Sequence, residues 1–175
     1  ALPISIFRNI RLFSINVVYK IVLLVLPFYY KAREKQLRNR TQLNIVFFLT
    51  HYADWKFEYL YRFMEKDPFF KPSIVLVPVN DFGRKDPQVE MIRSYSILHA
   101  KGYKVIKAYD FETKEYLDVK KQFSPDIVFY SCPYASLIDN MFYITKYLSC
   151  LPCYVSYNYG NSSDFKTFHN FRFHN

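Results

Sequence analysis

The chain has 175 residues and a mass of 21.2 kDa, enough for one domain of ordinary size with a short appendage. Hydrophobic residues make up 51% of it and charged residues 22%, which excludes an intrinsically disordered protein. The net charge of +9 is typical of nucleic-acid-binding proteins. Residues 1–40, however, hold eight basic side chains against Glu34 alone, a net charge of +7, which leaves +2 for the other 135 residues. Because the body is nearly neutral, we do not expect nucleic acid as a partner.

Residues 1–43 are expected to form a leader that associates with a membrane. Residues 4–21 place apolar side chains on one helical face and polar ones on the other, which predicts an amphipathic helix. The best apolar window, residues 12–30, has Lys20 near its centre, where a charge costs on the order of 2.5–3.5 kcal/mol in a bilayer. We therefore expect a peripheral helix at the cytoplasmic face of the cell membrane, the alternative being an ordinary first helix packed on the domain. The basic residues expected to contact anionic lipid are Arg8, Arg11, Lys20, Lys31, Arg33, Lys35, Arg38 and Arg40.

From residue 44 onward, short β-rich runs alternate with longer helical patterns. Strands are predicted at residues 44–49, 73–79, 103–108, 127–130 and 154–157, and helices at residues 55–66, 87–101, 113–123 and 136–148. The second helix has the clearest signals: Asp86 as N-cap, Pro87 at the first helical position and Gly102 as the stop. This alternation predicts a Rossmann-like three-layer α/β/α domain over residues 44–175, with a parallel sheet of about five strands. The pattern stops where another helix is expected, so we expect the chain to be a piece of a longer protein.

Ligands of such sheets bind at the carboxyl ends of the strands, and the loop after the first strand is the best equipped for chemistry. His51 is placed to accept a proton from an acceptor hydroxyl, Asp54 to orient its ring, and Trp55 to stack on a sugar. The alternative is structural: Asp54 caps a helix, Trp55 packs in the core, and His51 is a surface loop residue. Further candidates for substrate binding at this edge are Asn80, Asp81, Tyr134, Asn158, Tyr159 and Gly160.

Several kinds of site are not expected. The three glycines are too scattered for a phosphate-binding loop, so we predict no nucleotide cofactor of the standard kinds. The histidines lack metal-ligand spacing, so we predict no metal. Cys150 and Cys153 have the spacing of a redox or zinc half-site but no second pair, which favours buried structural thiols.

The body resembles the N-terminal half of bacterial CDP-glycerol glycerophosphotransferases and related capsule or teichoic-acid-type enzymes of the two-domain GT-B architecture. The resemblance spans roughly residues 44–160 and is carried by residues 44–49, 55–56, 61–68, 102–106, 116–120 and 125–129. Two features depart from that family. Tyr159-Gly160 stands at the nearest match to its catalytic His-Gly, and the nucleotide-holding half would lie beyond Asn175.

The resemblance implies the acceptor-side domain of a membrane-associated transferase in bacterial surface-polymer synthesis. Such an enzyme moves a glycerophosphate or sugar from a nucleotide-activated donor to a lipid-linked or polymeric glycan acceptor. The donor would bind through the missing C-terminal half, so this chain alone is not expected to catalyse transfer, and His51 remains the candidate base. The alternative is a non-catalytic α/β module, tethered to the membrane, that binds a partner or a glycan.

Overall fold

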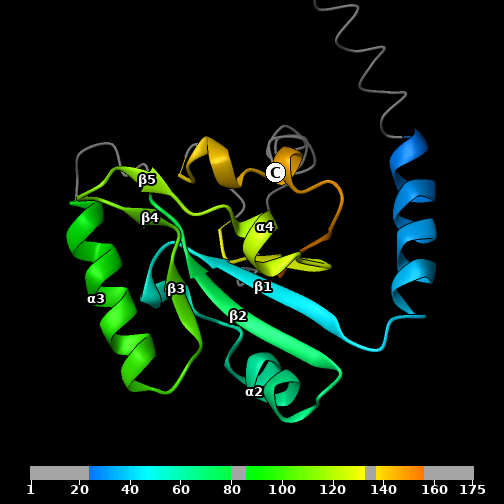
Figure 1. Ribbon diagram of the computed structural model, residues 1–175, viewed down its shortest axis with the longest axis horizontal. Coiled ribbons are helices and arrows are strands. Elements are labelled where there is room, and N and C mark those ends of the chain that lie inside the picture. Colours follow the sequence, from blue (N-terminus) through cyan, green and yellow to red (C-terminus); the bar gives the residue numbers. More distant parts are fainter. Residues whose placement is uncertain (1–23, 80–85, 133–136, 156–175) are drawn as a thin grey trace, which may run out of the picture. The chain divides into compact units, whose positions relative to one another are not determined.

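The computed structural model describes residues 24–79, 86–132 and 137–155. The chain divides into two compact units, Ala1–Asn39 and Arg40–Asn175. In the first unit, residues 24–37 are helical, and Pro27 lies within this helix (blue in Figure 1). The amphipathic stretch predicted at residues 4–21 lies outside the described residues.

The second unit is built on a five-stranded sheet in which every neighbouring pair of strands is parallel. Its order is β3-β2-β1-β6-β7, so β1 is the central strand (Figure 1). The strands are β1 Leu43–Leu49, β2 Phe70–Leu76, β3 Val105–Lys107, β6 Ile127–Tyr130 and β7 Leu151–Tyr154. With helices flanking this sheet, the predicted Rossmann-like α/β fold is confirmed.

The two faces of the sheet are covered differently. Successive side chains of a strand point to opposite faces, so Phe47 and Phe48 of β1 belong to two separate layers of the core. Phe47 contacts the rings of Phe57 and Tyr61, beside and within α2 (Glu58–Lys66). Phe48 contacts Phe142 and Tyr147, in the segment of 3-10 turns that follows β6. Figure 1 shows α4 (Val119–Phe123) and this segment across the sheet from α2. Both phenylalanines are fully buried, as the uninterrupted apolar run of a central parallel strand requires.

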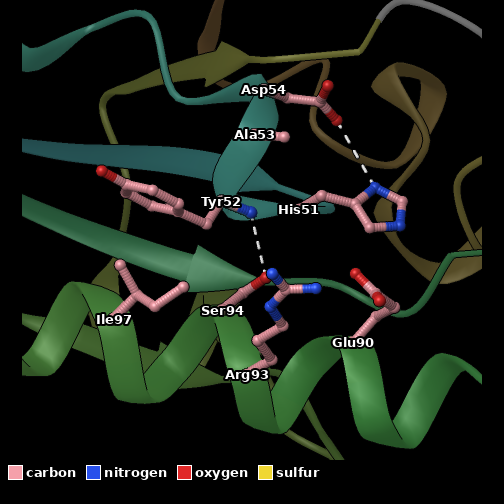
Figure 2. Close-up of a pocket in the computed structure, with 8 residues that line it drawn as sticks. All are labelled: His51, Tyr52, Ala53, Asp54, Glu90, Arg93, Ser94 and Ile97. Atoms are coloured by element: carbon pink, nitrogen blue, oxygen red, sulfur yellow. Dashed lines mark hydrogen bonds and ion pairs between the residues drawn. The ribbon is translucent and has the colours of Figure 1, made fainter.

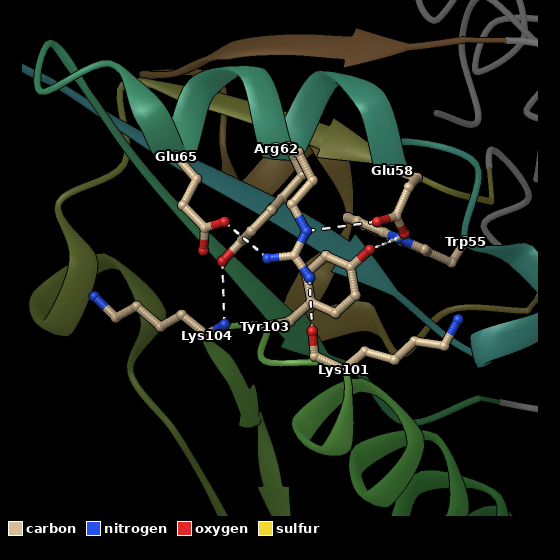
Figure 3. Close-up of polar contacts among 8 residues, drawn as sticks. Trp55, Glu58, Arg62, Glu65, Lys101, Tyr103 and Lys104 are labelled. Carbon is tan, nitrogen blue, oxygen red and sulfur yellow. Dashed lines mark hydrogen bonds and ion pairs between the residues drawn. The ribbon is translucent and has the colours of Figure 1, made fainter.

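A network of polar contacts fixes α2 to the turn between α3 (Pro87–Ala100) and β3 (Figure 3). The Arg62 guanidinium donates to the Lys101 carbonyl oxygen at 2.6 Å and to Glu65 at 2.7 Å. It also lies over the Tyr103 ring, 4.1 Å from the ring centroid. Because one side chain bonds both elements, α2 and the end of α3 are held together on the same face of the sheet.

The prediction for α3 is confirmed within one residue. The Asp86 side chain accepts a hydrogen bond from Gln88 N, Pro87 is the first helical residue, and Gly102 has a φ of +76° beyond the helix end. Other boundaries differ. The helix predicted from residue 55 begins at Glu58, after a 3-10 turn, η1 (Tyr52–Asp54). The strands predicted at 73–79 and 154–157 begin and end three residues earlier, so that β2 contains Pro72 and β7 contains Pro152.

Two predicted helices are wrong over most of their length. Residues predicted as the first part of a helix at 113–123 form a hairpin instead, β4 (Tyr109–Asp110) paired antiparallel with β5 (Glu115–Tyr116). Its loop is stabilised because Asp110 accepts the backbone N–H groups of Glu112 and Thr113. Over the described part of 136–148, two short 3-10 turns, Asn140–Phe142 and Ile144–Lys146, replace the predicted helix.

The three cysteines are free thiols. Cys150 is buried and its Sγ donates to the Pro125 carbonyl oxygen at 3.1 Å, as expected of a structural thiol. Cys132 and Cys153 are only partly buried, so that expectation holds for Cys150 alone.

Candidate functional site

The topology marks one place on the sheet edge as the most favourable for a ligand. Strands β2 and β3 lie on one side of β1, and β6 and β7 on the other. The chain therefore leaves the carboxyl ends of β1 and β6 in opposite directions, and ligands of open α/β sheets bind in the crevice at such a switch point. The residues that follow these two strands are Thr50–Lys56 and Ser131–Cys132.

The loop after β1 returns on itself and brings a carboxylate to a histidine. The 3-10 turn η1 places Asp54 Oδ2 3.5 Å from His51 Nδ1 and 2.9 Å from the donating Thr50 Oγ1. The contact with the imidazole and the hydrogen bond from Thr50 lower the pKa of Asp54 against the opposing effect of burial. Asp54 is consequently an anion at neutral pH, and it faces one nitrogen of the ring.

The other ring nitrogen is in an unusual environment. His51 Nε2 is buried and has no hydrogen-bond partner among the described residues. A buried polar atom without a partner has lost its hydrogen bonds to water, which costs free energy. Such atoms are therefore uncommon in folded proteins. Because the Asp54 carboxylate lies 3.5 Å from Nδ1, it favours the neutral tautomer that carries its proton there and leaves the Nε2 lone pair available.

His51 lies on the wall of a cavity of about 280 Å³ between the loop after β1 and α3 (Figure 2). The Tyr52 backbone N–H donates to Ser94 Oγ at 2.9 Å, which fixes the loop against the helix. Figure 2 shows Glu90 and Arg93 pointing from α3 toward the loop that carries His51 and Asp54. The residues that line the cavity are His51, Tyr52, Ala53, Asp54, Glu90, Arg93, Ser94 and Ile97.

A cation lies at the same edge, on the side of β6 and β7. Lys56 Nζ donates to the Ser131 carbonyl oxygen at 3.2 Å and lies 4.5 Å from the centroid of the Tyr154 ring. Burial lowers the pKa of Lys56, while the charge of Asp54 opposes that effect. The switch point thus combines a histidine–carboxylate pair with a partly desolvated ammonium group.

The structure brings two of the predicted site residues together and packs a third against the core. His51 and Asp54 lie together, whereas Trp55 packs edge-on against Phe47 and its Nε1 donates to the Tyr103 hydroxyl at 3.2 Å. Asp54 does not cap α2, whose N-cap is Phe57. The remaining candidates lie outside the described residues: Asn80, Asp81, Tyr134, Asn158, Tyr159 and Gly160.

The basic residues of the leader are also divided. Arg40 belongs to the second unit, where its guanidinium lies 3.6 Å from the buried carboxylate of Asp126. In the first unit, Arg38 pairs with Glu34 at 2.6 Å, and Lys31, Arg33 and Lys35 lie on the helix at residues 24–37. Arg8, Arg11 and Lys20 fall outside the described residues. None of the helices over the described ranges has the length and apolar character needed to cross a bilayer.

The three polar side chains that α3 contributes to the cavity were not predicted from the sequence: Glu90, Arg93 and Ser94. They lie on a helix some 40 residues after His51, and no local motif marks them. Only the crossover from β2 to β3 brings them to the loop after β1. Within residues 24–79, 86–132 and 137–155, no group of three or more His, Cys, Asp or Glu side chains is arranged to hold a metal ion.

Comparisons of this chain with protein-family models, curated proteins and solved structures give no match.

Proposed function

We propose that this chain is the acceptor-side domain of a membrane-associated transferase, with His51 as the general base. The observation that carries the proposal is the buried His51 Nε2, which has no partner among the described residues and lies beside a cavity at the carboxyl end of β1. A general base needs a lone pair within reach of the proton it removes and a neighbour that holds the ring in the correct tautomer. Asp54 is placed for that second role.

In the proposed reaction, an acceptor hydroxyl in the cavity donates its proton to His51 Nε2. Its oxygen attacks the phosphorus or anomeric carbon of a nucleotide-activated donor, and the bond to the nucleotide breaks. The nucleotide leaves with the bonding electron pair, and Asp54 stabilises the imidazolium that forms. Lys56 supplies a positive charge at the same edge of the sheet, where negative charge develops on the donor. By the resemblance to two-domain enzymes, the nucleotide itself would be held by a second domain.

We further propose that the first unit binds the cytoplasmic face of the cell membrane and gives the enzyme access to a lipid-linked or polymeric glycan. In the helix at residues 24–37, four large apolar side chains are exposed: Leu24, Val25, Phe28 and Tyr29. Lysine and arginine side chains share this helix, and the combination of apolar area with basic charge favours anionic interfaces.

Replacing His51 by Ala should lower the rate of transfer by about 10²- to 10⁴-fold, the usual contribution of a general base. The rate is measured with the complete enzyme and a panel of radiolabelled nucleotide-activated donors. His99→Ala is the matched control, because His99 lies on the far end of α3, stacked on Tyr95, and should leave the rate unchanged. Wild-type turnover by the His51→Ala enzyme would exclude His51 as the base.

Deleting residues 1–39 should move the protein from the pellet to the supernatant when it is sedimented with vesicles containing phosphatidylglycerol. The expected loss follows from removing both the exposed apolar side chains and most of the net positive charge. Vesicles of phosphatidylcholine alone serve as control and should bind the full chain more weakly. Equal sedimentation of both proteins with the anionic vesicles would contradict the membrane role of the leader.

A further inference from the structure

The polar groups on the wall of the His51 cavity are incompletely paired, and they fall into two kinds. Two are hydrogen-bond donors. Ser94 Oγ accepts the Tyr52 N–H, but its own hydroxyl proton has no acceptor among the described residues. Arg93 carries five N–H donors and makes no hydrogen bond or ion pair with another described side chain.

Arg93 is exposed on α3 and forms no ion pair with another described residue, although an acidic residue is close to it in sequence. Glu90 lies three residues earlier on the same helix, a spacing at which Glu and Arg side chains can meet. The same spacing in the opposite order does give an ion pair elsewhere in this chain, between Arg62 and Glu65 at 2.7 Å. On α3, the two charged groups both line the cavity without reaching each other, and Figure 2 shows them as separate side chains.

The other two groups are acceptors, namely the Glu90 carboxylate and His51 Nε2. A ligand that pairs all four groups must present hydroxyl protons to Glu90 and His51 and an acceptor-rich group to Arg93 and Ser94. Arg binds carboxylate and phosphate groups through two parallel N–H bonds, which makes an anionic group the best fit on that side. The cavity of about 280 Å³ is near the lower limit for ligand pockets, about 300 Å³, so it fits one small unit.

We infer that Glu90 and Arg93 are specificity-determining residues and that the cavity binds a hydroxyl-bearing anion, such as a sugar acid or a sugar phosphate. This assignment rests on the proposed function, since the ligand's hydroxyl near Nε2 is the one that reacts. Arg93 and Ser94 bind the anionic group, and Glu90 accepts a second hydroxyl. The chain would therefore select an acceptor unit that carries a negative charge.

Four probes separate the two halves of the ligand. Glucuronate and glucose 6-phosphate carry both hydroxyls and an anion, glucose lacks the anion, and inorganic phosphate lacks the hydroxyls. Binding to the full chain is measured by titration, following the backbone amide NMR signals of Tyr52, Asp54 and Arg93. We expect the two hydroxylated anions to bind about tenfold more tightly than glucose. Comparing glucuronate with glucose 6-phosphate then shows whether the anionic group is a carboxylate or a phosphate.

Variants assign the roles. Arg93→Gln should weaken binding of both hydroxylated anions by about tenfold and leave glucose unchanged, whereas Glu90→Gln should weaken glucose and not phosphate. Lys121→Gln removes the same charge from α4 and should have no effect. Equal binding of glucose and glucuronate would overturn the inference.

The binding assay also separates this inference from the proposed catalytic role. His51→Ala removes the base and one acceptor but leaves Glu90 and Arg93 in place, so it should weaken glucuronate binding less than Arg93→Gln does, and Arg93→Gln should still weaken binding when added to it. Wild-type transfer by His51→Ala would contradict the proposed function but not the specificity assignment. Unchanged binding of glucuronate by Arg93→Gln would contradict the specificity assignment but not the proposed function.

Discussion

The two faces of the sheet are covered by different kinds of structure. The Phe47 face carries two regular helices, α2 and α3, fastened to each other by Arg62. The Phe48 face carries the short helix α4, capped by Asp118, and two 3-10 turns, of which the first is capped by Asp139. The candidate cavity lies between the loop after β1 and α3, on the regular face. This fold therefore places its longer, regular helices next to the residues proposed to bind substrate, where fixed geometry matters most.

Removing either central phenylalanine should give the largest effect on stability. Phe47→Ala and Phe48→Ala should each lower the free energy of unfolding by about 3–5 kcal/mol, because both side chains are fully buried. The two variants should nevertheless differ in their spectra. Trp55 is the only tryptophan, and its ring lies 5.6 Å from that of Phe47, so Phe47→Ala should change its near-UV circular dichroism while Phe48→Ala leaves it intact.

Urea titrations followed by far-UV circular dichroism give the stabilities, with the near-UV signal recorded on the folded variants. Equal changes of the tryptophan signal in both variants would show that the two layers are coupled. The distinction drawn between the faces would then fail.

A smaller effect is expected on the Phe48 face, where Tyr116 OH donates to Asp139 Oδ2 at 2.7 Å and ties the hairpin to the first 3-10 turn after β6. This bond raises the pKa of Tyr116 from 10.0 to about 12. A raised pKa in the folded state means that the stabilisation is complete below about pH 10 and is lost as the pH rises toward about 12.

Tyr116→Phe should therefore be less stable than wild type at pH 8, and the difference should shrink between pH 10 and pH 12. Denaturant unfolding at several pH values measures it. Tyr59→Phe, at a tyrosine that is 92% exposed, is the control and should match wild type throughout. A difference that stays constant up to pH 12 would mean that the Tyr116 hydroxyl does not contribute through this proton.

The sequence predicted the fold where local signals agreed with the tertiary structure. Asp86, Pro87 and Gly102 define α3 by capping and backbone conformation alone, and the apolar run of β1 needs no context to be read as a buried strand. The stretch at residues 113–123 has helical periodicity, but Asp110 forms a turn with its own backbone and Tyr109 pairs with Tyr116 across the hairpin. Tertiary pairing thus overrode the helical pattern in residues that precede α4.

The candidate site was predictable only in its local part. His51 and Asp54 are three residues apart, so a loop after a buried strand suffices to suggest the pair. Trp55 was predicted as a site residue in the same way, but its ring packs in the aromatic layer instead. Glu90, Arg93 and Ser94 reach the cavity through the βαβ crossover, and their position depends on the strand order, which the sequence alone does not specify.

The central claim is that His51 acts as the general base through Nε2. The position of the proton on its ring tests this claim most directly, because a base at Nε2 requires that nitrogen to be unprotonated. Long-range ¹H–¹⁵N correlation spectra of the imidazole, with His51→Ala used for assignment, distinguish the two neutral tautomers. We predict that the neutral ring carries its proton on Nδ1, facing Asp54, and that the population shifts toward the other tautomer in Asp54→Asn. A proton on Nε2 in the wild-type protein would contradict the role of His51 as the base.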